Sequence, residues 1–127
     1  MKDAYWRRFR LLRIVDGDTI HATVDLGFRC TTEQAIRLLG IDTPELHGHG
    51  AEEAAKAQAA KEFVEDWARE HRHVSPGWMV PWPYLLRSEK GDSFGRWLGV
   101  VECAEGHVLN DDLLAAGHAV PYRKVHT

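Results

Sequence analysis

The sequence predicts an α+β domain that is mainly β: a five-stranded barrel with two to three helices. Five segments have the apolar runs or the alternation typical of strands, a long amphipathic segment follows the third, and a shorter one follows the fifth. The chain has 127 residues, of which 44% are hydrophobic, enough for one hydrophobic core and too few for two. We therefore expect a single domain over residues 1–127, with its core between about residues 8 and 123.

The first two strands are predicted to form a hairpin. Residues 9–15 are apolar and interleaved with arginine, and the Asp16-Gly17 pair that follows is a strong hairpin signal. Residues 19–26 alternate strictly, which places four apolar side chains on one face of a half-buried strand: Ile20, Ala22, Val24 and Leu26. Gly27 permits a bend or bulge, and residues 35–41 form a third strand that ends at Asp42-Thr43-Pro44.

The second half of the chain supplies helices and two more strands. A helix is predicted over residues 51–69, because apolar side chains recur there on one helical face: Ala55, Ala59, Ala60, Phe63, Val64 and Trp67. Residues 71–83 form a loop, in which Trp78 and Trp82 either stack on bases or pack against the barrel.

Short strands at 84–87 and 96–102 flank a turn, and a last helix over about 108–116 is followed by Gly117 as its C′ residue. Five strands with a helix after the third is the order of an OB-fold barrel, an architecture that often binds nucleic acid.

Composition narrows the classes of function. Cys30 and Cys103 lack the paired spacing of a zinc site or a disulfide framework, so we expect free thiols in a reducing interior. No apolar run is long enough for a membrane span and no secretory leader is recognised, so we expect a cytoplasmic protein with no membrane contact.

Charge gives only a local signal for nucleic acid. The formal net charge of −3 is not that of a chain that neutralises many phosphates. Residues 2–13 nevertheless hold five basic side chains against one acidic side chain: Lys2, Arg7, Arg8, Arg10 and Arg13 against Asp3. A solvated basic surface is an equally good interpretation of this cluster.

Three carboxylates are candidates for site chemistry. Asp18 lies past the expected turn, where a hairpin does not need a second carboxylate, so its side chain is available to a metal. Asp42 and Glu45 flank Thr43-Pro44, and a strand end alone requires only one of these acidic residues. Two carboxylates with a fixed carbonyl between them are hard oxygen ligands of the kind that Ca²⁺ prefers.

Two arginines complement these acids. Arg37 sits inside an otherwise apolar strand, where an arginine is unfavourable unless it pairs with a carboxylate or reaches an anionic ligand. Arg96 follows Gly95 at the start of the fifth strand, and on its own it is an ordinary cation beside a hairpin.

Together these residues fall in three motifs: Val15-Asp16-Gly17-Asp18-Thr19, Ile36-Arg37-Leu38-Leu39-Gly40-Ile41-Asp42-Thr43-Pro44-Glu45, and Asp92-Ser93-Phe94-Gly95-Arg96. In order and spacing they resemble the staphylococcal-nuclease-like (thermonuclease) family. Residues 106–119 are similar to that family's final turn and helix, and the resemblance covers about residues 8–123.

The resemblance implies an OB-fold barrel whose site binds one Ca²⁺ through Asp18, Asp42 and the carbonyl of Thr43. It also implies that Glu45 acts as the general base for the attacking water. The implied reaction is hydrolysis of phosphodiester bonds that leaves a 3′-phosphate. The implied substrate is DNA, with RNA as a second candidate and single strands favoured, and we expect a monomer.

Physical chemistry gives the two arginines a matching role. The pentacoordinate transition state of phosphodiester hydrolysis carries more charge than the ground state, so cations aimed at its equatorial oxygens stabilise it selectively. Arg37 and Arg96 are expected to supply them, because a guanidinium donates paired hydrogen bonds to phosphate that a lysine cannot reproduce.

Two residues are candidate substrate contacts, and two histidines are set aside. Phe94 stands where the family often has a tyrosine, so one hydroxyl contact to a terminal phosphate is missing. Tyr122 resembles a family tyrosine that stacks on the nucleotide, and its alternative role is packing. His47 and His49 invite a transition-metal interpretation, but the main set of candidates is all oxygen and arginine.

Two other functions compete with a nuclease. One is a catalytically silent OB-fold module that binds nucleic acid or protein, and the other is a generic metal-binding OB domain. The first has no physical need for two uncompensated carboxylates beside Glu45, and the second leaves Arg37 and Arg96 unexplained.

Overall fold

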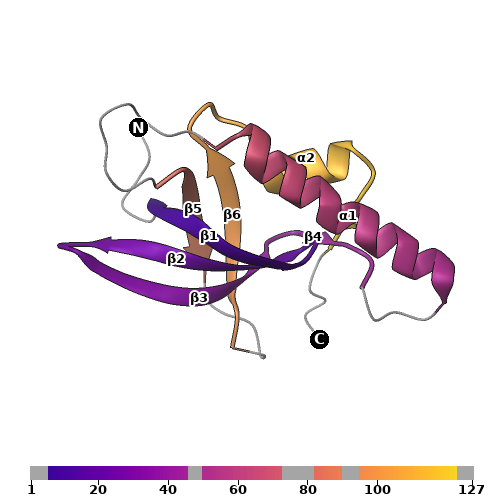
Figure 1. Cartoon of the computed structure of the whole chain (residues 1–127), viewed down its shortest axis with the longest axis horizontal. Helices are drawn as coiled ribbons and strands as arrows, with labels where there is room; N and C mark the ends of the chain where they lie inside the picture. Colours follow the sequence, from indigo (N-terminus) through magenta and orange to yellow (C-terminus); the bar gives the residue numbers. More distant parts are fainter. Residues whose placement is uncertain (1–5, 46–49, 73–81, 90–94, 123–127) are drawn as a thin grey trace.

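The computed structural model describes residues 6–45, 50–72, 82–89 and 95–122. Figure 1 shows the arrangement of its elements, which are, in chain order, β1 (Trp6–Asp16), β2 (Thr19–Gly27), β3 (Cys30–Leu38), β4 (Ile41–Asp42), α1 (Ala51–Glu70), β5 (Tyr84–Glu89), β6 (Trp97–Cys103), α2 (Leu109–Ala115) and β7 (Val120–Pro121). Within this part of the chain, no helix has the length and hydrophobicity that crossing a bilayer requires.

Five strands close a barrel in the order β1-β2-β3-β6-β5, and β5 pairs back onto β1. The β3–β6 pair is parallel and the other four pairs are antiparallel. The helix α1 follows the third barrel strand, with the short strand β4 between them. This confirms the predicted mainly β, α+β class and the OB-fold barrel.

Two bulges shape β1. Leu11 pairs with Ala22 and Arg13 with His21, so Leu12 is an extra residue, and Val15 is a second one between Ile14 and Asp16. Because each extra residue resets the alternation, the apolar side chains of β1 continue to face the core across the first bulge. Phe9 is buried, and Leu11 and Ile14 pack against the core cluster.

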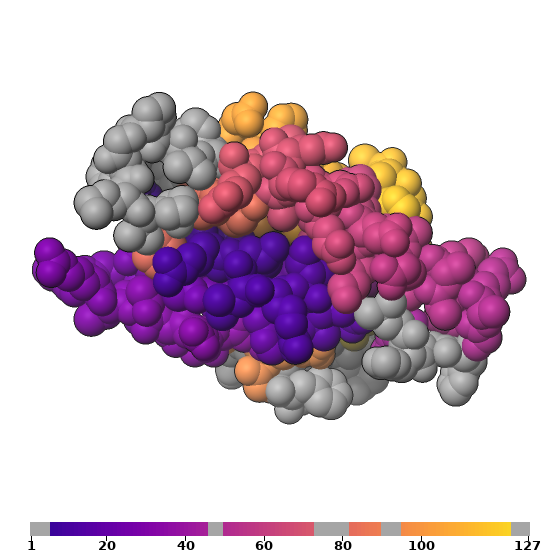
Figure 2. Space-filling model, viewed as in Figure 1, coloured from indigo at the N-terminus to yellow at the C-terminus, as the bar shows by residue number. Residues whose placement is uncertain are grey.

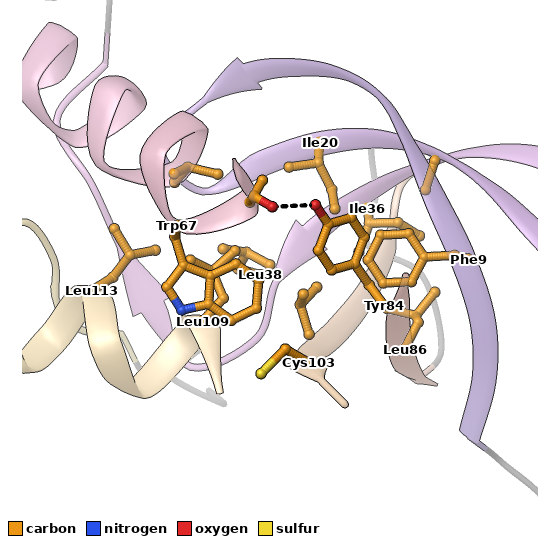
Figure 3. Close-up of a cluster of buried hydrophobic side chains, with 14 of the residues drawn as sticks. Phe9, Ile20, Ile36, Leu38, Trp67, Tyr84, Leu86, Cys103, Leu109 and Leu113 are labelled. Carbon is orange, nitrogen blue, oxygen red and sulfur yellow. Dashed lines mark hydrogen bonds between the residues drawn. The ribbon is translucent and has the colours of Figure 1, made fainter. Parts of the chain in front are cut away.

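The core lies between the inner faces of the strands and the two helices (Figure 3). The helix α1 packs against β1 and α2, and α2 packs against β6, so both helices cover one side of the barrel. Two hydrogen bonds tie α1 to its neighbours: Trp67 Nε1 donates to Asp112 Oδ2 at 2.8 Å, and the Tyr84 hydroxyl donates to the carbonyl of Ala68, the dashed line in Figure 3.

The buried face of α1 agrees with the predicted one at Ala60, Val64 and Trp67 and differs from it toward the amino end of the helix. The buried residues are Ala57, Ala60, Val64, Trp67 and Ala68, whereas Ala55 is exposed. The helix extends beyond the barrel at its amino end, as Figure 1 shows, so its first turns have no core to face. Leu26 is exposed for a similar reason, since it lies near the far end of the long β2–β3 hairpin.

The third strand also differs from the prediction over residues 35–41. It begins at Cys30 and ends at Leu38, and Gly40, at φ +80°, separates it from Ile41–Asp42. Those two residues pair with Val120–Pro121 as a separate two-stranded sheet, β4–β7, which the sequence did not predict.

Other details match the prediction. Gly27 takes φ +84° at a register shift in the β2–β3 pair, as expected for a bulge. Gly117, at φ +80°, follows α2 and donates to the carbonyl of Leu114, while His118 donates to that of Leu113, which is a Schellman end. Cys30 and Cys103 are both free thiols. The predicted residues Trp78 and Phe94, and His47 and His49, lie outside the described residues.

Candidate active site

The turn between β1 and β2 holds Asp18. Asp16 pairs with Thr19, so the turn consists of Gly17 and Asp18, and Asp18 lies in the turn rather than past it as predicted. Its side chain is nearly buried: Oδ1 accepts a hydrogen bond from the Thr19 hydroxyl at 3.1 Å, and Oδ2 accepts one from the main-chain N–H of Thr43 at 3.1 Å. These two bonds fix the carboxylate and join the turn to the segment after β4.

Gly17 lets three elements meet at this turn. A Cβ atom added there would lie 2.8 Å from Ala60 Cβ on α1 and 3.0 Å from Thr43 Oγ1. Gly17 does not take a positive φ. The Asp16-Gly17 signal therefore has a different physical basis from the left-handed turn that it usually indicates: Gly17 provides the space in which α1 and the β4 segment pack against the turn.

Arg37 lies on β3, directly opposite Thr19 in the β2–β3 register. Its Nη1 donates to the carbonyls of Leu38 at 2.9 Å and Ile41 at 2.8 Å, and its side chain is only 13% exposed. Nη2 lies 3.2 Å from Asp42 Oδ1 and 3.5 Å from Asp18 Oδ2. The carboxylate partner that an arginine in an apolar strand requires is therefore present twice.

The guanidinium of Arg37 is held by the main chain at Nη1 and faces two carboxylates at Nη2. Both N–H groups of Nη1 can be satisfied by carbonyls, while the structure shows no partner for Nε among the described residues. The Nε–Nη2 edge is the one with which an arginine binds a carboxylate or phosphate in bidentate fashion. The main chain therefore sets the orientation of this edge, whose Nη2 lies beside Asp42 and Asp18.

Asp42 is in an electrostatically unfavourable position. Its partial burial raises its pKa above the usual value, the negative charge of Asp18 raises the pKa further, the Arg37 guanidinium opposes the shift by lowering it, and a hydrogen bond to the Asp18 side chain adds to the increase. One guanidinium therefore compensates two neighbouring carboxylates only in part.

This donor set fits a hard divalent cation. Asp18 and Asp42 supply carboxylate oxygens, and the main chain of Thr43 is held beside Asp18 by its N–H bond. Among the residues that the structure describes, no group of three or more His, Cys, Asp or Glu side chains could hold a metal. A cation bound here would take its remaining ligands from main-chain carbonyls and water.

Arg96 and Tyr122 border the same site. Arg96 Nη1 lies 3.5 Å from the Thr19 hydroxyl oxygen. Thr19 is the residue of β2 that pairs with Arg37 on β3, so both arginines lie beside Thr19. The Tyr122 ring centroid is 5.6 Å from the Arg37 guanidinium carbon, and the residue is half exposed. The main-chain N–H of Tyr122 donates to the carbonyl of Gly40, which fixes the segment after β7 beside Arg37.

Glu45 is exposed. It lines an open cavity of about 660 Å³ between the segment after β4, α1 and the turn before β7, together with Asp42, Thr43, Pro44, Glu53, Lys56, Ala59, Gly117, His118, Ala119 and Val120. The cavity connects Glu45 with Asp42, and among the described residues no hydrogen bond or ion pair joins Glu45 to Arg37 or Asp18.

The structure thus brings Asp18, Arg37, Asp42, Thr43, Arg96 and Tyr122 into one site and places Glu45 at its margin. The class of protein that these observations define is an OB-fold barrel with carboxylates and arginines gathered at one place.

Comparison with known families identifies that class. The family described as staphylococcal nuclease homologue matches residues 35–127, which is more than half of the chain, so the protein belongs to this nuclease-type family. The matched segment contains Arg37, Asp42 and Glu45, while Asp18 lies ahead of it and is joined to the site by the contacts above. A comparison with curated proteins finds no matching relative.

The sequence did not reveal how the site is supported. Thr19 connects Asp18 to Arg96 through its hydroxyl, and the carbonyls of Leu38 and Ile41 orient Arg37. Thr19 could have been found from the hairpin register, since it lies opposite Arg37. The contacts to main-chain carbonyls could not be predicted from the sequence, because every residue type has a carbonyl.

Proposed function

We propose that the protein is a Ca²⁺-dependent nuclease that hydrolyses phosphodiester bonds of DNA, and of RNA as a second substrate, leaving a 3′-phosphate. The observation that carries the proposal is the anchored guanidinium of Arg37: carbonyls hold its Nη1, and its Nε–Nη2 edge lies beside the carboxylates of Asp18 and Asp42, where a phosphate and a cation would meet. Membership of the nuclease-type family supports the same reaction class.

In this proposal Arg37 and Arg96 bind the scissile phosphate. Their charges stabilise the extra negative charge of the pentacoordinate transition state more than that of the ground state. Because Arg37 is already held by Leu38 and Ile41, little reorganisation is needed when the phosphate binds.

Asp18, Asp42 and the Thr43 carbonyl would hold the Ca²⁺. When bound, the ion polarises the phosphoryl group and neutralises part of its charge. The partly uncompensated charge of Asp18 and Asp42 supports this assignment, since a divalent cation would remove their mutual repulsion.

Glu45 is proposed as the general base. Its carboxylate takes a proton from the attacking water as the water oxygen forms a bond to phosphorus. The bond from phosphorus to the 5′-oxygen breaks, the leaving oxygen takes a proton from solvent, and the phosphate stays on the 3′-oxygen. The open cavity beside Glu45 supports the role because water and substrate can reach the carboxylate there.

The test incubates single- and double-stranded DNA with the protein in Ca²⁺ and, separately, in chelator, beside Arg37→Ala and Glu45→Gln. We expect degradation that needs Ca²⁺, favours single strands, and falls by about a hundredfold or more in both variants, because each removes a group used in the transition state. Glu45→Gln should still bind Ca²⁺. Tight binding of uncut DNA by the wild-type protein would favour a catalytically silent module instead.

A further inference from the structure

The outer face of β1 carries a row of arginines. The strand contains four arginines and a single carboxylate, Asp16, which lies at its end. Arg8 and Arg10 alternate with the buried Phe9 and therefore point outward. The bulge at Leu12 shifts the alternation by one residue, so that Arg13, opposite the outward-facing His21, joins the same face.

These three side chains are available for a ligand. Arg8, Arg10 and Arg13 are all exposed, and within the described part of the chain none of them takes part in an ion pair. Arg10 lies over the Trp82 ring, 5.1 Å from its centroid, which holds the guanidinium against a flat aromatic surface, and the residue as a whole is exposed. The surface of β1, in indigo, crosses the middle of the face in Figure 2.

The arginine row leads to the candidate active site. Arg13 pairs with His21, and the next outward residue of β2 toward the turn is Thr19, which pairs with Arg37 and lies beside Arg96. Outward residues of a strand repeat every two positions, about 6.7 Å apart. The row therefore forms a cationic path along the outer face of the barrel that leads toward the site and ends one residue pair before it, where Asp16 pairs with the buried, neutral Thr19.

The surrounding charge limits this path to β1. The helix α1 packs beside β1, and its exposed surface is mainly acidic, with Glu52, Glu53, Glu62, Glu65, Asp66 and Glu70. On the opposite side, Glu33 faces outward from β3, across the β2–β3 pair from Thr23. Among the described residues between α1 and β3, the positive charge that would attract a polyanion therefore lies along the arginine row.

We propose that Arg8, Arg10 and Arg13 bind successive backbone phosphates of a single-stranded nucleic acid and guide it into the site. This inference rests on the proposed function for the class of substrate, and it adds that the substrate spans several nucleotides beyond the scissile bond. Trp82 contributes an aromatic surface beside Arg10, in the middle of the row, on which a base can stack.

The test compares the wild-type protein with the triple variant R8Q/R10Q/R13Q. A matched control, K61Q/R69Q/R72Q, removes the same amount of charge from another surface: Lys61 and Arg69 lie on α1, and Arg72 follows its end. Binding of a fluorescent 12-nucleotide single strand is measured by anisotropy over a range of salt concentrations. Chelator is present, so that the strand is not hydrolysed during the measurement. Hydrolysis of the 12-mer and of a dinucleotide is then measured in Ca²⁺, and circular dichroism checks the fold of each variant.

We expect R8Q/R10Q/R13Q to bind the 12-mer about tenfold or more weakly, and its slope of log affinity against log salt to be shallower by about 2, since each lost single-strand contact contributes about 0.7. Its kcat/KM for the 12-mer should fall about tenfold more than that for the dinucleotide, mainly through KM. The control should resemble the wild type in both assays.

An unchanged salt slope and an unchanged ratio of the two substrates in R8Q/R10Q/R13Q would overturn the inference. An equal loss in the control would also overturn it, because the effect would then come from net charge. If the wild-type protein cuts neither substrate, the proposed function fails, and the anisotropy still decides whether the row binds single strands.

Discussion

Arg37 joins more parts of the site than its neighbours do, because it contacts the main chain and the two carboxylates with different nitrogen atoms. Nη1 bridges the carbonyls of Leu38 and Ile41 across the break between β3 and β4, and Nη2 faces Asp18 and Asp42. A residue with one charged nitrogen could make one of these sets of contacts at a time.

Asp42 gives a stability prediction at the same scale. Its pKa is raised in the folded protein, so the native state holds the proton more tightly than the unfolded chain, and ionisation of Asp42 lowers stability as pH rises from the ordinary aspartate range through the raised pKa. In metal-free protein at pH 7, Asp42→Asn should therefore raise the free energy of unfolding. The gain should be under about 1 kcal/mol, because solvent screens a half-exposed carboxylate.

Urea unfolding at pH 7 and near pH 4 measures this effect. The advantage of Asp42→Asn should shrink at the lower pH, and added Ca²⁺ should stabilise the wild-type protein but not the variant. A variant that is less stable than the wild type at pH 7 without metal would show that Asp42 is not under electrostatic strain.

At the scale of elements, the β1–β2 turn, the β4 segment and α1 are packed through Gly17. The close approach to Ala60 and Thr43 leaves no room for a side chain. Gly17→Ala should destabilise the fold by about 1–3 kcal/mol, since one element must move. It should also weaken Ca²⁺ binding, because Asp18 and Thr43 lie on the two elements that would separate.

A second substitution distinguishes steric crowding from a backbone effect. Ala60→Gly removes the atom that the new Cβ would meet at 2.8 Å, although glycine inside a helix costs about 1 kcal/mol by itself. In a double-mutant cycle measured by urea unfolding, the double variant should therefore lose less stability than the two single variants lose together. Strict additivity would argue against the contact between Gly17 and α1.

The sequence predicted those elements in which apolar residues recur at the spacing of a strand or of a helix. The alternation of β2 and the helical spacing of α1 both correspond to elements in the structure, and Gly117 ends α2 as expected. The strands β4 and β7 have two residues each, too few to show a period, and only the fold brings them together. The first turns of α1 were misjudged because periodicity does not show where the barrel ends.

The residue types of the site were predictable, and its supporting contacts were not. Isolated acidic and basic residues in apolar or turn positions pointed to Asp18, Arg37 and Asp42, which the structure brings together. The contacts that hold them in place use main-chain N–H and carbonyl groups, which every residue has. The role of Glu45 stays a prediction, because it lies at the margin of the site.

At the scale of the whole molecule, Asn110 connects α2 to the barrel where it closes. Its Oδ1 accepts from the N–H of Val101 at 3.1 Å, and its Nδ2 donates to the carbonyls of Leu39 at 2.9 Å and Gly99 at 3.1 Å. Gly99 lies opposite Leu38 in the parallel β3–β6 pair, and the side chain of Asn110 is buried. One side chain thus supports the closing strand pair from the helix side.

Asn110→Leu should destabilise the protein by about 2–3 kcal/mol, because a side chain of similar size leaves buried donors and acceptors unsatisfied. Urea unfolding measures the loss. Asn110→Asp is the matched variant, since it keeps the acceptor for Val101 and loses the amide donor. A change below about 0.5 kcal/mol in Asn110→Leu would mean that the barrel closes without this connection.

The central claim is that an anchored guanidinium at position 37 binds the scissile phosphate beside a bound cation. Its most direct test is the single-turnover rate at which Arg37→Lys cuts a single-stranded oligonucleotide at saturating Ca²⁺, compared with the wild-type rate. The variant keeps the positive charge but cannot hold both carbonyls and a phosphate, so we predict a rate about a hundredfold lower with the fold retained. A rate within about threefold of the wild type would contradict the claim.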